Sequence, residues 1–328
     1  MKTAKRLLTL FLSLGVGILL IWLVVRGCTP KDMADMKRAL TRANLWWLLV
    51  SALLGMVSHI SRAIRWNYTL SAICIQTGFW NRLCAVVINY LVNLAIPRMG
   101  EVSRCAVLSR YENTPFDKTF GTLITERVID LLVLVLLAAS FVAWQHHAVL
   151  SYLHVLSQGK IPNRKMLLVL SISTLVALAI GLFCLKKSNH PLAQKIKTPI
   201  RGLVEGMRAI DKVKQKWAFI GHTILIWSLY MLMTGVCYFA LPETTSVPFS
   251  GVLGAFVLGG ISIIITPGGL GAYPIAIQQI LLRYGVTAAT GYAFGWLVWL
   301  AQTLMVLTLG LASTIALPLI NKGHIWRR

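Results

Sequence analysis

Long apolar runs constrain this chain more than any other feature. A helix needs about 20 apolar residues to cross the hydrocarbon core of a bilayer. Six runs of roughly that length predict full transmembrane helices, at residues 7–25, 45–61, 128–144, 166–185, 217–241 and 292–317. Charged residues make up only 13% of the chain, about half the usual share in a soluble domain. The sequence therefore predicts an all-α, polytopic integral membrane protein and excludes a soluble or secreted one.

Two further apolar runs are shorter, and each ends at a break rich in proline and glycine. Residues 83–96 precede Pro97-Arg98-Met99-Gly100-Glu101, and residues 252–265 precede Thr266-Pro267-Gly268-Gly269-Leu270-Gly271. Runs of about 14 residues are typical of re-entrant half-helices. We therefore expect two re-entrant helical hairpins inside a single domain spanning 1–328. Because paired interruptions are typical of inverted repeats, the candidate repeats are 1–145 and 166–320.

The distribution of charge predicts the orientation. The chain has 32 Lys+Arg against 10 Asp+Glu, and nine of the basic residues fall in the loop 186–216. Basic loops between spans favour the cytoplasmic side, so the basic residues do not indicate a nucleic-acid partner. The sequence predicts a multi-pass protein of the cell (inner) membrane with cytoplasmic N- and C-termini. Residues 31–42 show helical spacing of apolar residues, which predicts an amphipathic helix on the outer surface.

Nothing in the sequence indicates a cofactor, a metal site or a catalytic constellation. Six cysteines are scattered singly, without a CxxC pair, so neither zinc ligation nor a disulfide framework is signalled. No Walker loop or metal-ligand spacing occurs. The protein is therefore expected to be a transporter rather than an enzyme, without a cofactor.

Ionisable residues at or inside apolar segments are the first candidates for function, because each costs about 2.5–3.5 kcal/mol at a membrane centre. The acidic ones are Glu101, Glu126 and Asp130. Glu126 and Asp130 are four residues apart and share a helix face, whereas Arg127 is expected to point elsewhere. Arg98 and Glu101 follow a proline inside an apolar surround, which favours a functional role.

Arginines are the second group of candidates, because the guanidinium binds phosphate through a two-pronged fork and stays charged when buried. Arg62, Arg65, Arg98 and Arg104 belong to it. A simpler alternative for Arg62 and Arg65 is that they only mark the cytoplasmic interface. In that interpretation Trp66 is an interfacial aromatic residue.

The glycine-rich break is the third candidate. Gly268, Gly269 and Gly271 allow backbone N–H groups to converge on an anion, and Pro274 is expected to open the next helix. The alternative is a tight turn that requires glycine for steric reasons alone.

Four sequence blocks occur in this order: His59-x-x-Arg62-Ala63-x-Arg65-Trp66; Asn93-x-x-x-Pro97-Arg98-x-Gly100-Glu101-x-x-Arg104; Thr125-Glu126-Arg127-x-x-Asp130; Thr266-Pro267-Gly268-Gly269-Leu270-Gly271. Together they resemble the transmembrane, flippase-like domain of lysylphosphatidylglycerol synthases and its stand-alone relatives, over about residues 5–320. The resemblance implies movement of a lipid between leaflets, without the lysyl transfer of the soluble synthase domain. Many relatives carry a glutamate shortly after the glycine block where this chain has Tyr273-Pro274, so its lipid headgroup is expected to differ.

The leading hypothesis is thus a lipid translocase for an anionic phospholipid or a polyprenyl-phosphate lipid, with a homo-oligomer left open. Two alternatives remain. One is a membrane-embedded transferase that acts on a polyprenyl-phosphate sugar donor, as the resemblance to archaeal relatives implies. The other is a scaffold for lipid-synthesis enzymes that does not itself transport.

Overall fold

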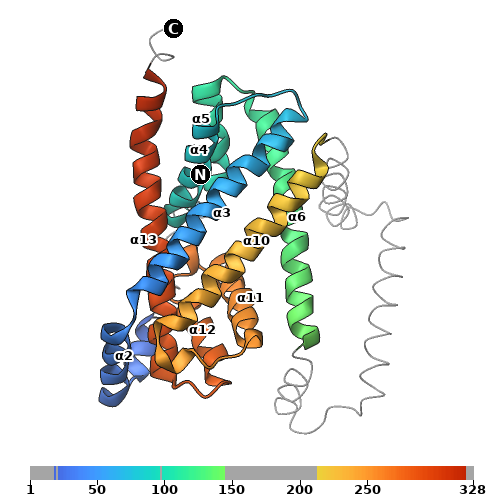
Figure 1. Ribbon diagram of the computed structural model, residues 1–328. Helices are drawn as coiled ribbons and strands as arrows, with labels where there is room; N and C mark the ends of the chain where they lie inside the picture. Colours follow the sequence, from blue (N-terminus) through green and yellow to red (C-terminus); the bar gives the residue numbers. More distant parts are fainter. Residues whose placement is uncertain (1–17, 20, 97, 145–212, 323–328) are drawn as a thin grey trace, which may run out of the picture. The chain divides into compact units, whose positions relative to one another are not determined.

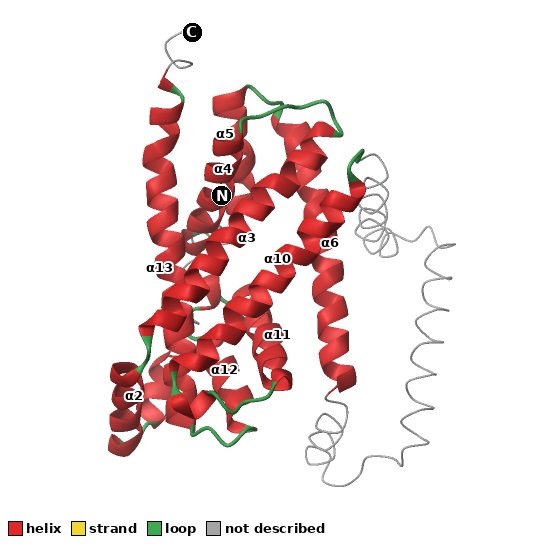
Figure 2. Cartoon of the chain, viewed as in Figure 1, coloured by secondary structure: helices red, strands yellow, loops and turns green. Residues whose placement is uncertain are grey.

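A computed structural model describes residues 18, 19, 21–96, 98–144 and 213–322 (Figure 1). Every regular element within these ranges is a helix, and they contain no strand (Figure 2). The predicted span 166–185, nearly all of the basic loop 186–216 and most of the span 7–25 lie outside the described residues. The chain divides into two compact units, residues 1–124 with 213–328 and residues 125–212.

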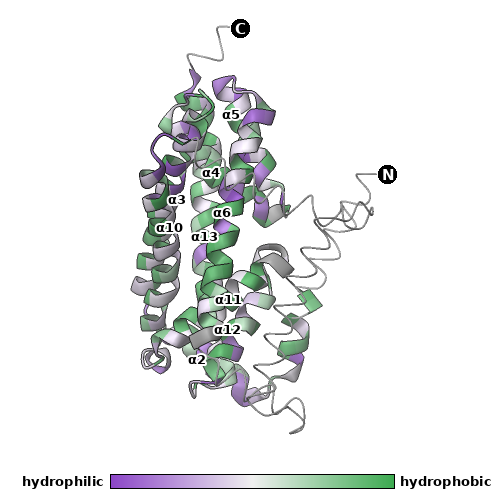
Figure 3. Cartoon of the chain, turned by 90° about the vertical axis from the view of Figure 1, so that its right-hand side faces the viewer, coloured by the Kyte–Doolittle hydropathy of each residue, from purple (hydrophilic) through white to green (hydrophobic). Residues whose placement is uncertain are grey.

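Three helices of the first unit are long and apolar enough to cross a membrane. They are α3 (Leu45–Ser71), α10 (Lys216–Cys237, extended by the short helix η2, Tyr238–Ala240) and α13 (Ala288–Ile320). Helices α3 and α10 lie side by side along most of their length (Figure 1). Hydrophobic segments occupy much of these long helices (Figure 3). Three of the six predicted spans are therefore confirmed as membrane-length apolar helices.

Helix α3 is ten residues longer than the predicted span 45–61. The prediction ended at Ser61 because polar residues follow it. No glycine or proline interrupts this stretch, and three of its polar residues, Arg62, Arg65 and Thr69, are buried. Burial against neighbouring helices thus lets the helix continue where composition suggested an end.

Helix α6 (Phe116–Trp144) contains the predicted span 128–144 but begins twelve residues before it. The added turns carry the polar block around Glu126. Residues 116–124 belong to the first unit and the rest to the second. The predicted total of six spans stays a prediction, because two of them fall largely outside the described residues.

Both predicted breaks are present. The first separates α4 (Phe79–Ala95) from α5 (Gly100–Glu112). The second separates α11 (Phe249–Ile265) from α12 (Ala272–Leu282), with the short helix η4 (Pro267–Gly269) between them. Helices α4 and α5 pack against each other, as do α11 and α12, and η4 contacts α4. The order long helix, broken pair, long helix occurs twice along the chain, whereas the re-entrant course of the pairs stays a prediction.

Helix α13 approaches its neighbours closely through glycine. A Cβ on Gly295 would lie 2.6 Å from the backbone of Pro274 in α12, and one on Gly310 would lie 2.6 Å from Leu91 in α4. Small residues permit such close approach of membrane helices, which gain stability from packing rather than from hydrophobic burial. The glycines of α13 thus help to hold both broken pairs in place.

The predicted amphipathic segment 31–42 is confirmed as a helix, α2 (Pro30–Arg42). Thr29 and Asp32 form a capping box at its start, in which each side chain accepts from the other residue's backbone N–H. The hydrogen bonds from Thr29 hold the pKa of the Asp32 carboxyl below its usual range. Its location on the outer membrane surface stays a prediction.

Candidate functional site

The arginines of α3 are buried. Arg62 is 2% exposed and Arg65 is 0% exposed. A side chain that only marks an interface extends its charged end to water, so that interpretation of Arg62 and Arg65 is wrong. Both arginines contact polar and aromatic groups of α10.

Arg62 belongs to a network that joins three helices. Its Nη2 donates to the hydroxyl of Tyr230 on α10 at 3.2 Å, and its guanidinium carbon lies 5.9 Å from the centre of the Tyr230 ring. The Tyr230 hydroxyl is 2.9 Å from that of Tyr90 on α4. The ring of Tyr90 stacks on His59, with the ring centres 4.5 Å apart. A cation, two hydroxyls and an imidazole thus lie in sequence inside the first unit.

Arg65 is held by a separate set of contacts one turn further along α3. Its Nη1 donates to Thr223 at 3.1 Å, and its guanidinium lies 5.4 Å from the centre of the Phe219 ring. Beside it, the Ser61 hydroxyl is 2.8 Å from Nδ1 of His222. These contacts orient Arg65 and join α3 to α10.

Arg104 joins this region from α5. Its guanidinium carbon lies 3.8 Å from the centre of the Trp66 ring, and it is 0% exposed. The indole N–H of Trp66 donates to Thr122 at 3.0 Å. Trp66 is itself fully buried, so the prediction that it marks a membrane interface is wrong. The cation–π contact instead brings Arg104 to the helix that carries Arg62 and Arg65.

The charged residues at the first break are less buried than the arginines of α3 and α5. Arg98 is exposed and has a φ of 64°. Its predicted role at a break inside the membrane stays a prediction. Glu101 is half-buried in the first turn of α5. The side chain of Asn93 accepts from the Gly100 N–H at 2.8 Å, which caps the start of α5.

Glu126 and Asp130 lie on the part of α6 that belongs to the second unit. Glu126 is fully buried and Asp130 nearly so. Arg127 lies 3.9 Å from the Asp130 carboxylate. The expectation that Arg127 points away is therefore wrong, because residues three apart on a helix are neighbours.

The glycine break forms a tight turn in which the Gly269 N–H donates to the carbonyl of Thr266 at 3.0 Å. Gly268, Gly269 and Gly271 all have positive φ, at 59°, 79° and 73°. The indole N–H of Trp299 donates to the Gly268 carbonyl at 2.6 Å. One amide of the expected anion nest is thus used within the turn. Helix α12 begins at Ala272, so the prediction that Pro274 is its first residue is wrong.

The sequence prediction missed the neutral groups of this cluster. Tyr230 and Thr223 accept from Arg62 and Arg65, Tyr90 contacts Tyr230, and Thr122 accepts from Trp66. Only tertiary packing brings these residues into one cluster. It also missed Arg82, a nearly buried residue of α4 that donates to the carbonyls of Ala63 and Thr77. In the described part of the chain, no group of three His, Cys, Asp or Glu residues could hold a metal.

Comparison with known proteins identifies the family. The lysylphosphatidylglycerol synthase TM region matches residues 10–310. The UPF0104 membrane protein PH1989 of Pyrococcus horikoshii is 22% identical over 322 residues, covering 87% of this chain and 89% of that protein. No solved structure matches. The chain belongs to the family of the lysylphosphatidylglycerol synthase TM region, and it is a membrane protein.

Proposed function

We propose that this member of the lysylphosphatidylglycerol synthase TM region family is a flippase-like translocase that moves an anionic phospholipid or a polyprenyl-phosphate lipid between leaflets. One observation carries the proposal. Arg62, Arg65 and Arg104 are at most 2% exposed within helices of membrane length and their neighbours. A buried guanidinium that makes hydrogen bonds to neutral hydroxyls keeps its positive charge and attracts a phosphate.

The phosphate is the part of the lipid that most opposes translocation, because a charge at the membrane centre is costly. Arginine lowers this cost by charge-assisted hydrogen bonds, which are about twice as strong as neutral ones. Arg62 is the best-placed binding residue, since its partner Tyr230 is a hydroxyl that phosphate oxygens can replace. Arg65 and Arg104 supply positive potential from the same helix and from α5.

The positions of the acidic residues and of the two broken helix pairs suit further roles in this proposal. Glu101, Glu126 and Asp130 are proposed to pair with arginines during the cycle or to carry a coupling proton. The two broken pairs are proposed to be re-entrant hairpins whose tips, at η4 and the end of α4, line the lipid's path. The protein is proposed to cross the cell membrane several times with both termini in the cytoplasm, as its basic loops favour.

A headgroup-accessibility assay in proteoliposomes tests the proposal. Arg62→Gln is expected to slow lipid movement at least tenfold, because an amide removes the charge but keeps polarity. The matched control is Arg82→Gln, since Arg82 is also nearly buried but donates to the backbone carbonyls of Ala63 in α3 and of Thr77 in the loop before α4. It should lower stability and leave the rate per folded molecule within twofold. Equal rates for Arg62→Gln and the unmodified protein would overturn the proposal.

A further inference from the structure

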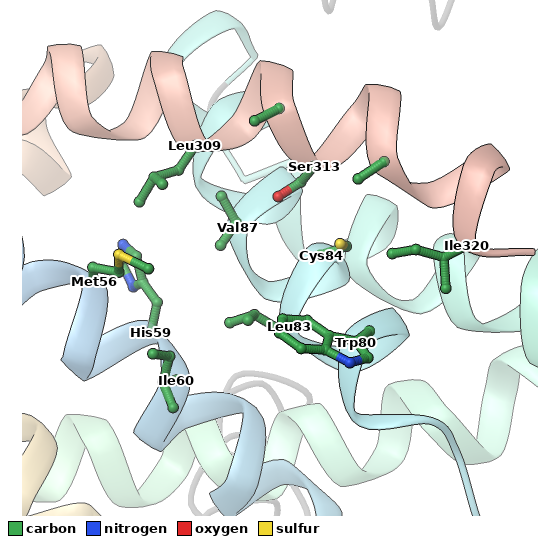
Figure 4. A pocket seen from close by; sticks show the side chains of 12 residues that line it. Met56, His59, Ile60, Trp80, Leu83, Cys84, Val87, Leu309, Ser313 and Ile320 are labelled. Atoms are coloured by element: carbon green, nitrogen blue, oxygen red, sulfur yellow. The ribbon is translucent and has the colours of Figure 1, made fainter.

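An apolar pocket of about 430 Å³ lies between α3, α4 and α13 in the first unit (Figure 4). Apolar side chains form most of its wall, including Met56, Leu83, Val87, Leu309 and Ile320. Its volume falls within the range of small-molecule sites, about 300–1,000 Å³. Along α13 it extends from Leu309 to Ile320, about 16 Å at 1.5 Å per residue. The pocket is therefore long enough for a substantial length of one hydrocarbon chain.

His59 and Ser313 are polar residues in this wall, and His59 is the titratable one. Its side chain reaches the pocket from α3 beside Met56 (Figure 4), and the residue is only 4% exposed. Neither ring nitrogen has a hydrogen-bond partner among the described residues. Buried polar groups are almost always paired, so this imidazole indicates that a water molecule or a ligand completes the site.

The same residue joins the pocket to the arginine network. One face of His59 stacks on Tyr90, whose hydroxyl contacts Tyr230, and Tyr230 accepts from Arg62. A ligand at this place would find apolar walls on one side of His59 and hydroxyls and a cation on the other. A lipid has this division between its chain and its phosphate.

We propose that the pocket binds one acyl chain of a glycerophospholipid, with the glycerol and phosphate region at His59. This inference rests on the proposed function and specifies its substrate class. A second copy of the protein is a poorer occupant, because an apolar helix would leave His59 without a partner. A long polyprenyl chain fits less well, because the pocket extends only about 16 Å along α13, which is closer to the length of one acyl chain.

Photo-crosslinking tests the pocket directly. The purified full-length protein is reconstituted with a small fraction of phosphatidylglycerol that carries a diazirine on one acyl chain, and crosslinks are mapped by mass spectrometry. Labels at Leu309 and Ser313, which line the pocket, are expected to exceed labels at Leu311 and Ile315 of the same helix at least fivefold. Leu311 and Ile315 are exposed and lie outside the pocket.

A matched pair of variants sharpens the test. Ala312→Trp fills the pocket and should remove the excess labelling, whereas Ile315→Trp on the outer face should keep it. Equal labelling of the two faces in the unmodified protein would overturn the inference. So would enrichment with a diazirine-bearing polyprenyl phosphate but not with phosphatidylglycerol.

The two proposals fail separately. Enriched pocket labelling without lipid movement in proteoliposomes would support the acyl-chain site and refute the translocase. Movement that depends on Arg62 without pocket enrichment would keep the translocase and refute the acyl-chain site.

Discussion

At each of the two helix breaks, a backbone N–H must find an acceptor, and the two breaks supply it differently. At the first, a side chain closes the break: Asn93 accepts from the Gly100 N–H, and charged residues stand on either side. At the second, the backbone closes it: Thr266 accepts from Gly269, and three glycines adopt positive φ. The first break has charges to offer a substrate, whereas the second is neutral. In the proposed translocase, the first break takes part in binding and the second sets the shape of the lipid's path.

The largest expected effect is at the first break. A Cβ at residue 100 would lie 2.1 Å from the carbonyl oxygen of Asn89 and 2.6 Å from the side chain of Asn93. Gly100→Ala should therefore force α4 and α5 apart and cost about 3 kcal/mol, measured as the free energy of unfolding in mixed micelles. The control is Gly260→Ala in α11, where a Cβ meets nothing within 4 Å. Similar stabilities for the two variants would show that α4 and α5 are not packed this closely.

A smaller effect is expected at the second break. Gly269 has a φ of 79°, which costs a residue with a side chain about 1–2 kcal/mol, and a Cβ would also meet Ile263 and Tyr273 at 3.1 Å. Gly285→Ala is the matched control, because Gly285 has a φ of 82° but open space around it. Both variants should lose stability by unfolding measurements, and only Gly269→Ala should also slow lipid movement. An unchanged rate of lipid movement per folded Gly269→Ala molecule would show that the second break does not line the lipid's path.

The smallest expected effect concerns the cap of α5. Asn93→Ala removes the acceptor for the Gly100 N–H and should cost about 1 kcal/mol, seen as a lower melting temperature. Ser103→Ala in the same helix is the control, since Ser103 only donates back to the Gly100 carbonyl within its own turn, and a change below about 0.5 kcal/mol is expected. If both variants match the unmodified protein, the side chain of Asn93 does not close the first break.

Much of the fold could be predicted from local sequence. The breaks after residues 95 and 265 were predictable, because proline and glycine interrupt apolar runs whatever surrounds them. The identity of the candidate arginines was predictable too, because a charge in an apolar segment is costly and is therefore usually kept for a function. Their surroundings were not. The full length of α3 depends on contacts with α10, such as that between Arg65 and Thr223, which are 158 positions apart. The burial of Trp66 depends on packing against α4 and α5.

The sequence by itself determined that this chain is a helical membrane protein of its family, because apolar runs and their interruptions are local properties. Only the tertiary structure decided which polar groups share an interior. Arg62 reaches Tyr230 across 168 residues, and Tyr90 reaches it across 140. Such pairings leave no periodic trace in either helix, because a tyrosine in an apolar run looks the same whether it faces lipid or a cation. Helix packing brings them together, and it leaves His59 between the arginines and an apolar pocket.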